Sequence, residues 1–389
     1  MSVTAPQGFE ASGIASGIKI SGDPDLALVC TTDHKPVSAA AVFTSNLAKA
    51  APVLVSRAHL DQTSGKIAAV ICTSGNANAQ TGEAGKRAAE RLCEVVAFEI
   101  GSKPEEVLVC QTGLIGVPFP IDHAEAGIPH LVDSLAGSDD AGRRAAVAMM
   151  TTDTVEKQVA IRGDGFTVGG MAKGAAMLAP DMATMLAVLT TDAASEPDVL
   201  SRILTKAVSA SFNEMSVDGC CSTNDTVILL SSGLAEAVPE EKLTDAVVKA
   251  CAALAEAMVD DAEGASKVAR ISVTGAASDT EAAQGARKIA TSLLVKCSLN
   301  GADPYWGRVV SELGSAGISF DPDKVSVAYG GTIVCDEGVA VTHDADAVDA
   351  HLAGSHVEIE CDLKLGSGTS SMLTCDLGHG YIDENRTTS

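Results

Sequence analysis

Apolar positions follow two different spacings along the chain, and these spacings predict its strands and helices. Short apolar runs bounded by Gly, Pro and Asp predict strands at 26–30, 39–43, 67–72, 107–110, 227–230, near 325–335 and at 355–362. Apolar residues spaced by three and four, with caps at their ends, predict helices near 84–101, 141–150, 195–208, 243–258, after the capping box 278–281, and at 303–314. Because strands and helices alternate along the chain, the sequence predicts an α/β or α+β fold.

Composition limits the core and the domain count. The 389 residues suffice for two domains or one large sandwich. Apolar residues make up 46% of the chain but aromatic residues only 3%, so the core must be built from Ala, Val, Leu and Ile. We find no internal repeat, low-complexity segment or long linker in the sequence.

Charge and cysteine usage exclude several classes of protein. The formal net charge of −24 argues against nucleic acid or an anionic membrane as a partner. No apolar stretch approaches the roughly 20 residues of a membrane span, and the N-terminus lacks the pattern of a signal peptide. The eleven cysteines include no C-x-x-C pair, and the eight histidines have no metal-ligand spacing. We therefore expect a cytoplasmic protein with reduced thiols and no metal.

The segment 173–193 carries the strongest candidate chemistry. Pro180 and Asp181 predict a tight turn, and Thr184 opens the apolar run that follows it. This run suits a strand buried on both faces, although its spacing also fits a buried helix. A threonine held at the start of a buried element, with its hydroxyl toward the loop, is well placed for a nucleophile. The alternative is an ordinary residue that begins a strand.

A second candidate lies at 111–116, Gln-Thr-Gly-Leu-Ile-Gly, which follows the predicted strand 107–110. The two glycines near Thr112 let the backbone turn sharply and direct N–H groups toward one point. From the residues alone, a plain turn is the alternative.

The segment Lys-Gly-Ala-Ala-Met-Leu-Ala-Pro-Asp-Met-Ala-Thr-Met-Leu resembles the signature of the ornithine acetyltransferase (glutamate N-acetyltransferase) family of arginine biosynthesis. Further motifs in the same order cover nearly the whole chain: Ser-Gly-Asn-Ala-Asn-Ala at 74–79, Gly-Leu-Ile-Gly at 113–116, Ser-Thr-Asn-Asp at 222–225 and Trp-Gly-Arg at 306–308. The resemblance implies an αββα-type layered fold and self-cleavage between Ala183 and Thr184. An α segment 1–183 and a β segment 184–389 would result, folded together.

The chemistry of acyl transfer supports this resemblance. No Ser-His-Asp motif is present, and no histidine lies within about fifty residues of Thr184. An N-terminal threonine can use its own α-amino group as the base, since such groups titrate near ~7.7–8.0. That group exists only after cleavage, so self-cleavage is activation. By resemblance, Thr112 and Gly113 form the oxyanion hole.

The resemblance also implies the substrates and the residues that bind them. Acetyl would pass from N2-acetyl-L-ornithine to L-glutamate through an acetyl-threonine, without a cofactor. Whether acetyl-CoA is a second donor stays open, and family members are typically α2β2. The implied substrate-binding residues are Thr151, Lys173, Thr184, Glu263, Asn385 and Ser389, with Lys173 a natural partner for a carboxylate. The tail 385–389 departs from the family pattern because it lacks the usual aromatic residue and is one residue short.

Two other functions stay open at this point. A related self-processing amidohydrolase or aminopeptidase would use water as the acceptor. A regulatory protein that binds amino acids would perform no covalent chemistry and would stay uncut.

Overall fold

The computed structural model describes residues 2–179 and 185–386. The chain forms two compact units, of which the first comprises 1–213 with 220–258 and the second 214–219 with 259–388. The predicted cleavage position, between Ala183 and Thr184, lies outside the described residues and falls within the first unit rather than between the units.

The first unit contains two sheets. The four-stranded sheet has the order β1-β2-β5-β6 and consists of β1 (Phe9–Ile14), β2 (Leu26–Thr31), β5 (Ala69–Asn76) and β6 (Val107–Leu114). The six-stranded sheet has the order β4-β3-β11-β9-β8-β7 and consists of β4 (Lys66–Ile67), β3 (Val37–Phe43), β11 (Thr226–Ala235), β9 (Leu186–Ala193), β8 (Thr167–Lys173) and β7 (Lys157–Arg162). Strands from both sides of the predicted cut therefore share the six-stranded sheet.

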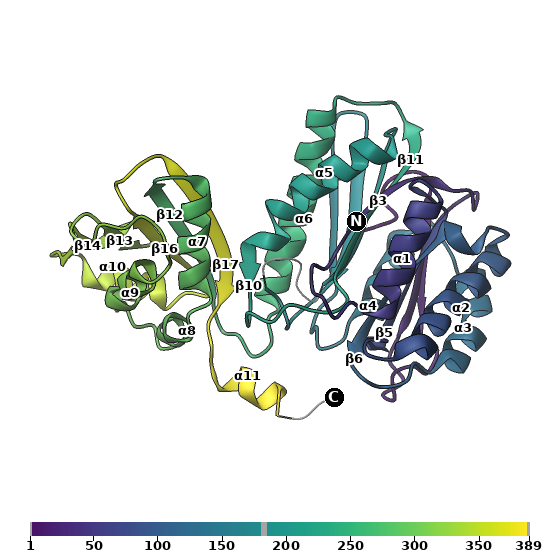
Figure 1. Ribbon diagram of the computed structural model, residues 1–389, viewed down its shortest axis with the longest axis horizontal. Helices are drawn as coiled ribbons and strands as arrows, with labels where there is room; N and C mark the ends of the chain where they lie inside the picture. The colour runs from purple at the N-terminus through teal and green to yellow at the C-terminus, as the bar shows by residue number, and fades with distance from the viewer. Residues whose placement is uncertain (1, 180–184, 387–389) are drawn as a thin grey trace. The chain divides into compact units, whose positions relative to one another are not determined.

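Helices cover the outer faces of both sheets (Figure 1). Helices α1 (Ala51–Gln62), α2 (Gly82–Ile100) and α3 (Ile121–Asp133) form one apolar core with the four-stranded sheet. Helices α5 (Pro197–Ser209) and α6 (Glu240–Asp260) cover the six-stranded sheet. The inner faces of the two sheets share a second core, which also takes in α4 (Asp139–Met149). This order of layers confirms the predicted αββα arrangement.

The second unit is built on one mixed sheet with the order β10-β17-β12-β16-β13-β14-β15. Its strands are β10 (Met215–Ser216), β12 (Val268–Ala276), β13 (Ser326–Tyr329), β14 (Thr332–Asp336), β15 (Val339–Ala340), β16 (His356–Asp362) and β17 (Gly368–Cys375). Helices α7 (Asp279–Ala290), α8 (Leu293–Asn300), α9 (Trp306–Gly314) and α10 (Ala345–Leu352) contribute to a single apolar core with it. Helix α11 (His379–Glu384) follows the last strand, and two 3₁₀ turns complete the elements, at Pro104–Glu106 and Phe212–Glu214.

The predicted strands at 26–30, 39–43 and 107–110 are confirmed as β2, β3 and β6. Most of 67–72 forms β5, but Ile67 belongs to β4 of the other sheet. The apolar run after Thr184 forms the strand β9, whose side chains are all buried, so the helical alternative is wrong. Two details differ. The stretch 325–335 is a hairpin of β13 and β14 that turns at Gly330 and Gly331, and α9 begins at Trp306, after the predicted start.

The capping box at 278–281 forms only in part. The Ser278 hydroxyl accepts the Glu281 N–H at 3.2 Å, as predicted for the N-cap. The Glu281 carboxylate instead accepts the N–H of Ser319 at 2.8 Å. A contact between distant segments has replaced the local one.

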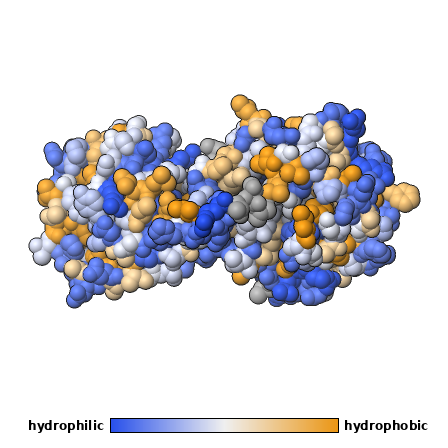
Figure 2. All heavy atoms as spheres, turned by 90° about the horizontal axis from the view of Figure 1, so that it is seen from below, coloured by the Kyte–Doolittle hydropathy of each residue, from blue (hydrophilic) through white to orange (hydrophobic). Residues whose placement is uncertain are grey.

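Hydrophobic and hydrophilic residues both contribute to the surface. On the face that Figure 2 shows, hydrophobic residues are interspersed with hydrophilic ones. Among the described residues, we find no helix that combines the length and the apolar character needed to cross a membrane.

Candidate active site

The predicted oxyanion turn lies at the end of β6 and depends on glycine. Gly113 has φ of 130°, and a Cβ atom there would lie 2.2 Å from the carbonyl carbon of Gly75 on the neighbouring strand β5. Only glycine fits this close approach of two backbones. The adjacent Thr112 is buried and pairs with Ser74, so the sheet fixes its position.

Lys173 brings the six-stranded sheet to this turn. It is the last residue of β8 and pairs with Leu186, near the start of β9. Its Nζ atom donates to Thr112 Oγ1 at 3.4 Å, and both side chains are buried. Thr112 and Lys173, far apart in sequence and predicted separately, therefore meet beside the strand that follows Thr184.

Asp153 anchors the segment that contains Thr151. Its Oδ2 atom accepts the Thr151 N–H at 3.0 Å and lies 4.0 Å from Lys173 Nζ. Its Oδ1 atom accepts Lys157 Nζ at 2.7 Å and the Gly174 N–H at 2.7 Å. One buried carboxylate thus holds the Thr151 backbone, Lys173 and the first residue after β8 together.

The protonation state of Asp153 follows from these contacts. Burial opposes its ionisation, but the charges of Lys173 and Lys157 and the hydrogen bonds from Lys157 and Thr151 outweigh it and lower the pKa of Asp153. The carboxylate is therefore ionised at neutral pH and stabilises the positive charge of Lys173.

Lys19 is a further cation near this group. Its Nζ atom donates to the carbonyl oxygens of Met150 at 2.7 Å and Pro24 at 2.8 Å. Burial lowers the pKa of Lys19, the charges of Asp25 and Asp23 oppose that effect, and the charge of Lys173 adds to it. The amine fixes the backbone just before Thr151.

The Ser-Thr-Asn-Asp motif at 222–225 joins the two sheets of the first unit. Asn224 Nδ2 donates to the carbonyl oxygen of Gln111, next to Thr112, at 2.8 Å and to that of Ala77 at 2.6 Å. Asp225 accepts the N–H of Met185, the residue that follows Thr184, at 2.9 Å. The motif therefore connects the oxyanion turn to the start of β9.

Glu263 and Asn385 lie in the second unit, where the structure brings them together. Asn385 Nδ2 donates to Glu263 Oε2 at 2.7 Å, and Glu263 is buried. Gly264 has φ of 63°, and a Cβ atom there would lie 2.0 Å from the Tyr381 nitrogen, so glycine lets α11 pack closely against this loop. The acid that follows α6 thus has a specific partner and is not a freely solvated charge.

Three predicted residues fall outside the described residues: Ala183, Thr184 and Ser389. Of the others, Thr112, Gly113, Thr151 and Lys173 belong to the first unit, and Glu263 and Asn385 to the second.

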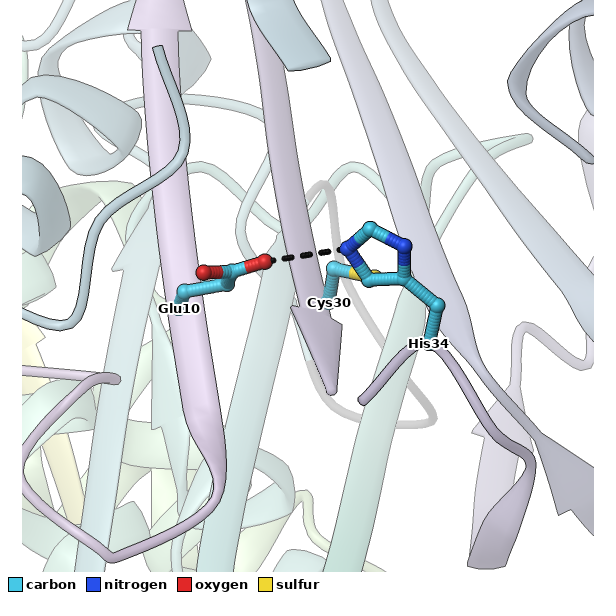
Figure 3. A group of neighbouring side chains, drawn as sticks. All are labelled: Glu10, Cys30 and His34. Atoms are coloured by element: carbon cyan, nitrogen blue, oxygen red, sulfur yellow. Dashed lines mark hydrogen bonds and ion pairs between the residues drawn. The ribbon is translucent and has the colours of Figure 1, made fainter. Parts of the chain in front are cut away.

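Within the described ranges, one group has the donors of a metal site: Glu10, Cys30 and His34, whose ligand atoms lie within 4.8 Å of one another (Figure 3). His34 Nε2 lies 3.2 Å from Glu10 Oε1, and Nδ1 lies 3.2 Å from the carbonyl oxygen of Ile100. Burial, and after it the charge of Glu10, raises the pKa of the Cys30 thiol to about 12, so the thiol is protonated. Strand register places Cys30 opposite Ala69, at the end of the sheet away from Thr112, so this group is not part of the candidate active site.

Comparison with known proteins identifies the family. The ArgJ family model matches residues 10–387. The chain belongs to the ArgJ family. Its resemblance to ornithine acetyltransferases is thereby confirmed.

Individual relatives match over almost their whole length. The chain is 49% identical to the arginine biosynthesis bifunctional protein ArgJ of Mycolicibacterium paratuberculosis, over 98% of this chain and 95% of the relative. It is 47% identical to the protein of the same name from Streptomyces coelicolor, over 99% of both. A solved structure of ornithine acetyltransferase complexed with ornithine, from Mycobacterium tuberculosis, is 48% identical and covers 46% of this chain and 94% of its own, with a TM-score of 0.44. The sequence matches carry the assignment.

Sequence reasoning missed four polar residues of the candidate site in this member of the ArgJ family. Asp225 belongs to the Ser-Thr-Asn-Asp motif at 222–225, and Asp153 lies two residues after Thr151, but nothing in the sequence shows which of these side chains is buried. Lys19 and Lys157 had no local signal, since each gains its partners only through contacts in the folded chain.

We expect Asp153→Ala to destabilise the protein by about 3–5 kcal/mol, because it leaves the buried charges of Lys157 and Lys173 without their carboxylate. Urea unfolding at neutral pH measures the loss. Since the pKa of Asp153 is depressed in the fold, its contribution is present above about pH 4, the ordinary value, and is lost as the pH falls further. The difference in unfolding free energy between the wild type and Asp153→Ala should therefore become smaller in acid.

Asp164→Ala is the matched control, because the Asp164–Lys242 pair at 3.4 Å is exposed. It should change stability by less than about 1 kcal/mol. Equal effects of the two substitutions would contradict the role assigned to Asp153.

Proposed function

We propose that this chain is the ornithine acetyltransferase, or glutamate N-acetyltransferase, of arginine biosynthesis. It transfers acetyl from N2-acetyl-L-ornithine to L-glutamate and releases ornithine and N-acetylglutamate. Membership of the ArgJ family supports this reaction. The observation that supports it most is the contact between Lys173 and Thr112, because Lys173 also pairs with Leu186, two residues after the proposed nucleophile.

Thr184 is the proposed nucleophile. The chain cuts itself between Ala183 and Thr184, and the new α-amino group then serves as the base for the Thr184 hydroxyl. The acetyl group of the donor forms an ester with that hydroxyl. The first product leaves, and the amine of glutamate attacks the ester.

Thr112 and Gly113 form the proposed oxyanion hole. Negative charge develops on the carbonyl oxygen when the hydroxyl attacks, and donors fixed in advance stabilise that charge most. The pairing of Gly113 with Gly75 supports this role, because it holds the backbone at the end of β6 against the neighbouring strand β5. Lys173 adds a positive charge next to Thr112.

The proposed substrate-binding residues are Thr151, Lys173, Thr184, Glu263, Asn385 and Ser389, carried over from the family. Lys173 suits the α-carboxylate that donor and acceptor share. The Glu263 carboxylate suits the side-chain amine of ornithine, and its bond to Asn385 orients it. The word bifunctional in the relatives' names supports acetyl-CoA as a second acetyl donor.

The proposed assembly is α2β2, with each α segment folded together with its β segment. The shared six-stranded sheet supports the folding of each α segment with its β segment, because β9 and β11 pair with strands that precede residue 183. The proposed location is the cytoplasm, where reduced thiols persist. The eleven free cysteines of the structure support it.

Self-processing is the first test. Denaturing gels of the purified protein should show two fragments, and N-terminal sequencing of one should begin Thr-Met-Leu-Ala-Val. Thr184→Ala should stay intact, because the attacking hydroxyl is gone. A different first residue, or normal cleavage of Thr184→Ala, would refute the assigned nucleophile.

Steady-state kinetics separate transfer from hydrolysis. If Thr184 carries the acetyl group between two amines, initial rates should give parallel double-reciprocal lines. Acetate release without glutamate should be slow, since a partly desolvated site holds back water. Intersecting lines would exclude the acyl-enzyme. Parallel lines with rapid acetate release would indicate a hydrolase instead.

A further inference from the structure

Asp225 lies beside the backbone of Met185, the residue that follows Thr184 in the sequence. It directly precedes β11, and its side chain is fully buried. Its Oδ1 atom accepts the Met185 N–H at 2.9 Å, while the next residue, Thr226, donates its N–H to the Met185 carbonyl at 3.2 Å. Parallel pairing of β11 with β9 fixes this register, so the carboxyl cannot move along the strand.

The second carboxyl oxygen of Asp225 is buried and has no hydrogen-bond partner among the described residues. Buried polar atoms are almost always paired, so such an atom requires an explanation. Burial raises the pKa of Asp225 well above its usual range, and the Met185 N–H, the nearby hydroxyls of Thr44 and Ser222 and the charge of Lys173 offset only part of that effect. Unlike Asp153, whose pKa is lowered, this carboxyl binds a proton more readily than an ordinary aspartate.

Four segments of the chain contribute the groups around Asp225. Lys173 faces it from β8, and the Met185 N–H from β9. Ser222 and Cys221 come from the segment before β11, and Cys221 Sγ lies 3.9 Å from the hydroxyl of Thr44, which follows β3. Lys173 favours the ionised carboxylate, and burial opposes it.

The proposed function leaves one step without a base. After cleavage, the α-amino group of Thr184 can take the proton of its hydroxyl. In the uncut chain that nitrogen belongs to a peptide bond and cannot accept a proton. The attack that causes cleavage therefore needs a different base.

We infer that Asp225 is the base for self-cleavage, an inference that rests on the proposed role of Thr184. Its Oδ2 atom takes the proton of the Thr184 hydroxyl as the oxygen bonds to the carbonyl carbon of Ala183. The bond between that carbon and the Thr184 nitrogen then breaks, and the nitrogen takes the proton from Asp225. Water hydrolyses the resulting ester, which gives the Ala183 carboxylate and restores the Thr184 hydroxyl.

Two substitutions at Asp225 separate a base from a mere hydrogen-bond acceptor. Asp225→Asn keeps the size of the side chain and an oxygen for the Met185 N–H, but it cannot take a proton. Asp225→Glu keeps the carboxyl group, but its longer side chain fits the buried site less well. We expect cleavage of the full-length Asn variant, followed on denaturing gels after pulse-labelled synthesis, to be slower than wild type by about 10²–10⁴-fold. The Glu variant should cleave faster than the Asn variant, with a rate that rises with pH to a plateau.

Asp192→Asn is the matched control. Asp192 is also buried, belongs to β9 and accepts backbone N–H groups, from Thr167 at 2.7 Å and Gln7 at 3.1 Å. This variant should cleave at the wild-type rate. The inference would be overturned if the Asn variant cleaved as fast as the Glu variant or faster. It would also be overturned if neither variant cleaved. Cleavage of the wild type at a bond other than Ala183–Thr184 would instead refute the proposed function.

Discussion

The Asp153 carboxylate, buried with Lys157, is the contact on which the arrangement of the first unit's site depends. A buried charge is costly unless it is paired and fully hydrogen-bonded. Asp153 meets this requirement with two lysines and two backbone N–H groups, and these come from the loop after α4 and from the ends of β7 and β8. The same contacts fix Lys173, which in turn contacts Thr112 at the end of the other sheet. The need to compensate one charge thus positions two of the predicted functional residues.

Two carboxyl groups with opposite protonation behaviour flank the start of β9. Asp153, on the side of β8, has cationic partners that lower its pKa. Asp225, on the side of β11, is buried with a pKa raised well above the usual range. This difference suits two roles, a permanent negative charge that organises lysines and a carboxyl that gains and loses a proton. The six-stranded sheet holds both in place, because β9 lies between β8 and β11.

The sequence predicted those parts of the fold whose signal is local. Strands such as β5 are apolar runs between turn residues. The sharp backbone turn predicted at Gly113 is also local, and the fold leaves no room there for a Cβ atom. The strand β8 escaped prediction because Gly169 and Gly170 interrupt it, and glycine weakens the signal of a strand. Those glycines have a reason in the fold, since a Cβ atom at Gly169 would lie 2.4 Å from the carbonyl oxygen of Ser2. The partners of Asp225 and Lys19 could not be predicted, because parallel pairing and loop packing bring them from distant parts of the chain.

The central claim of this account is that Thr184 carries the acetyl group. The most direct measurement is the mass of the 184–389 fragment after the enzyme has been incubated with N2-acetylornithine in the absence of glutamate and quenched in acid. We expect an increase by the mass of one acetyl group, located by peptide mapping on the Thr184 side-chain oxygen and removed when glutamate is added before the quench. An unmodified fragment, or an acetyl group on another residue that glutamate removes at the rate of turnover, would contradict the claim.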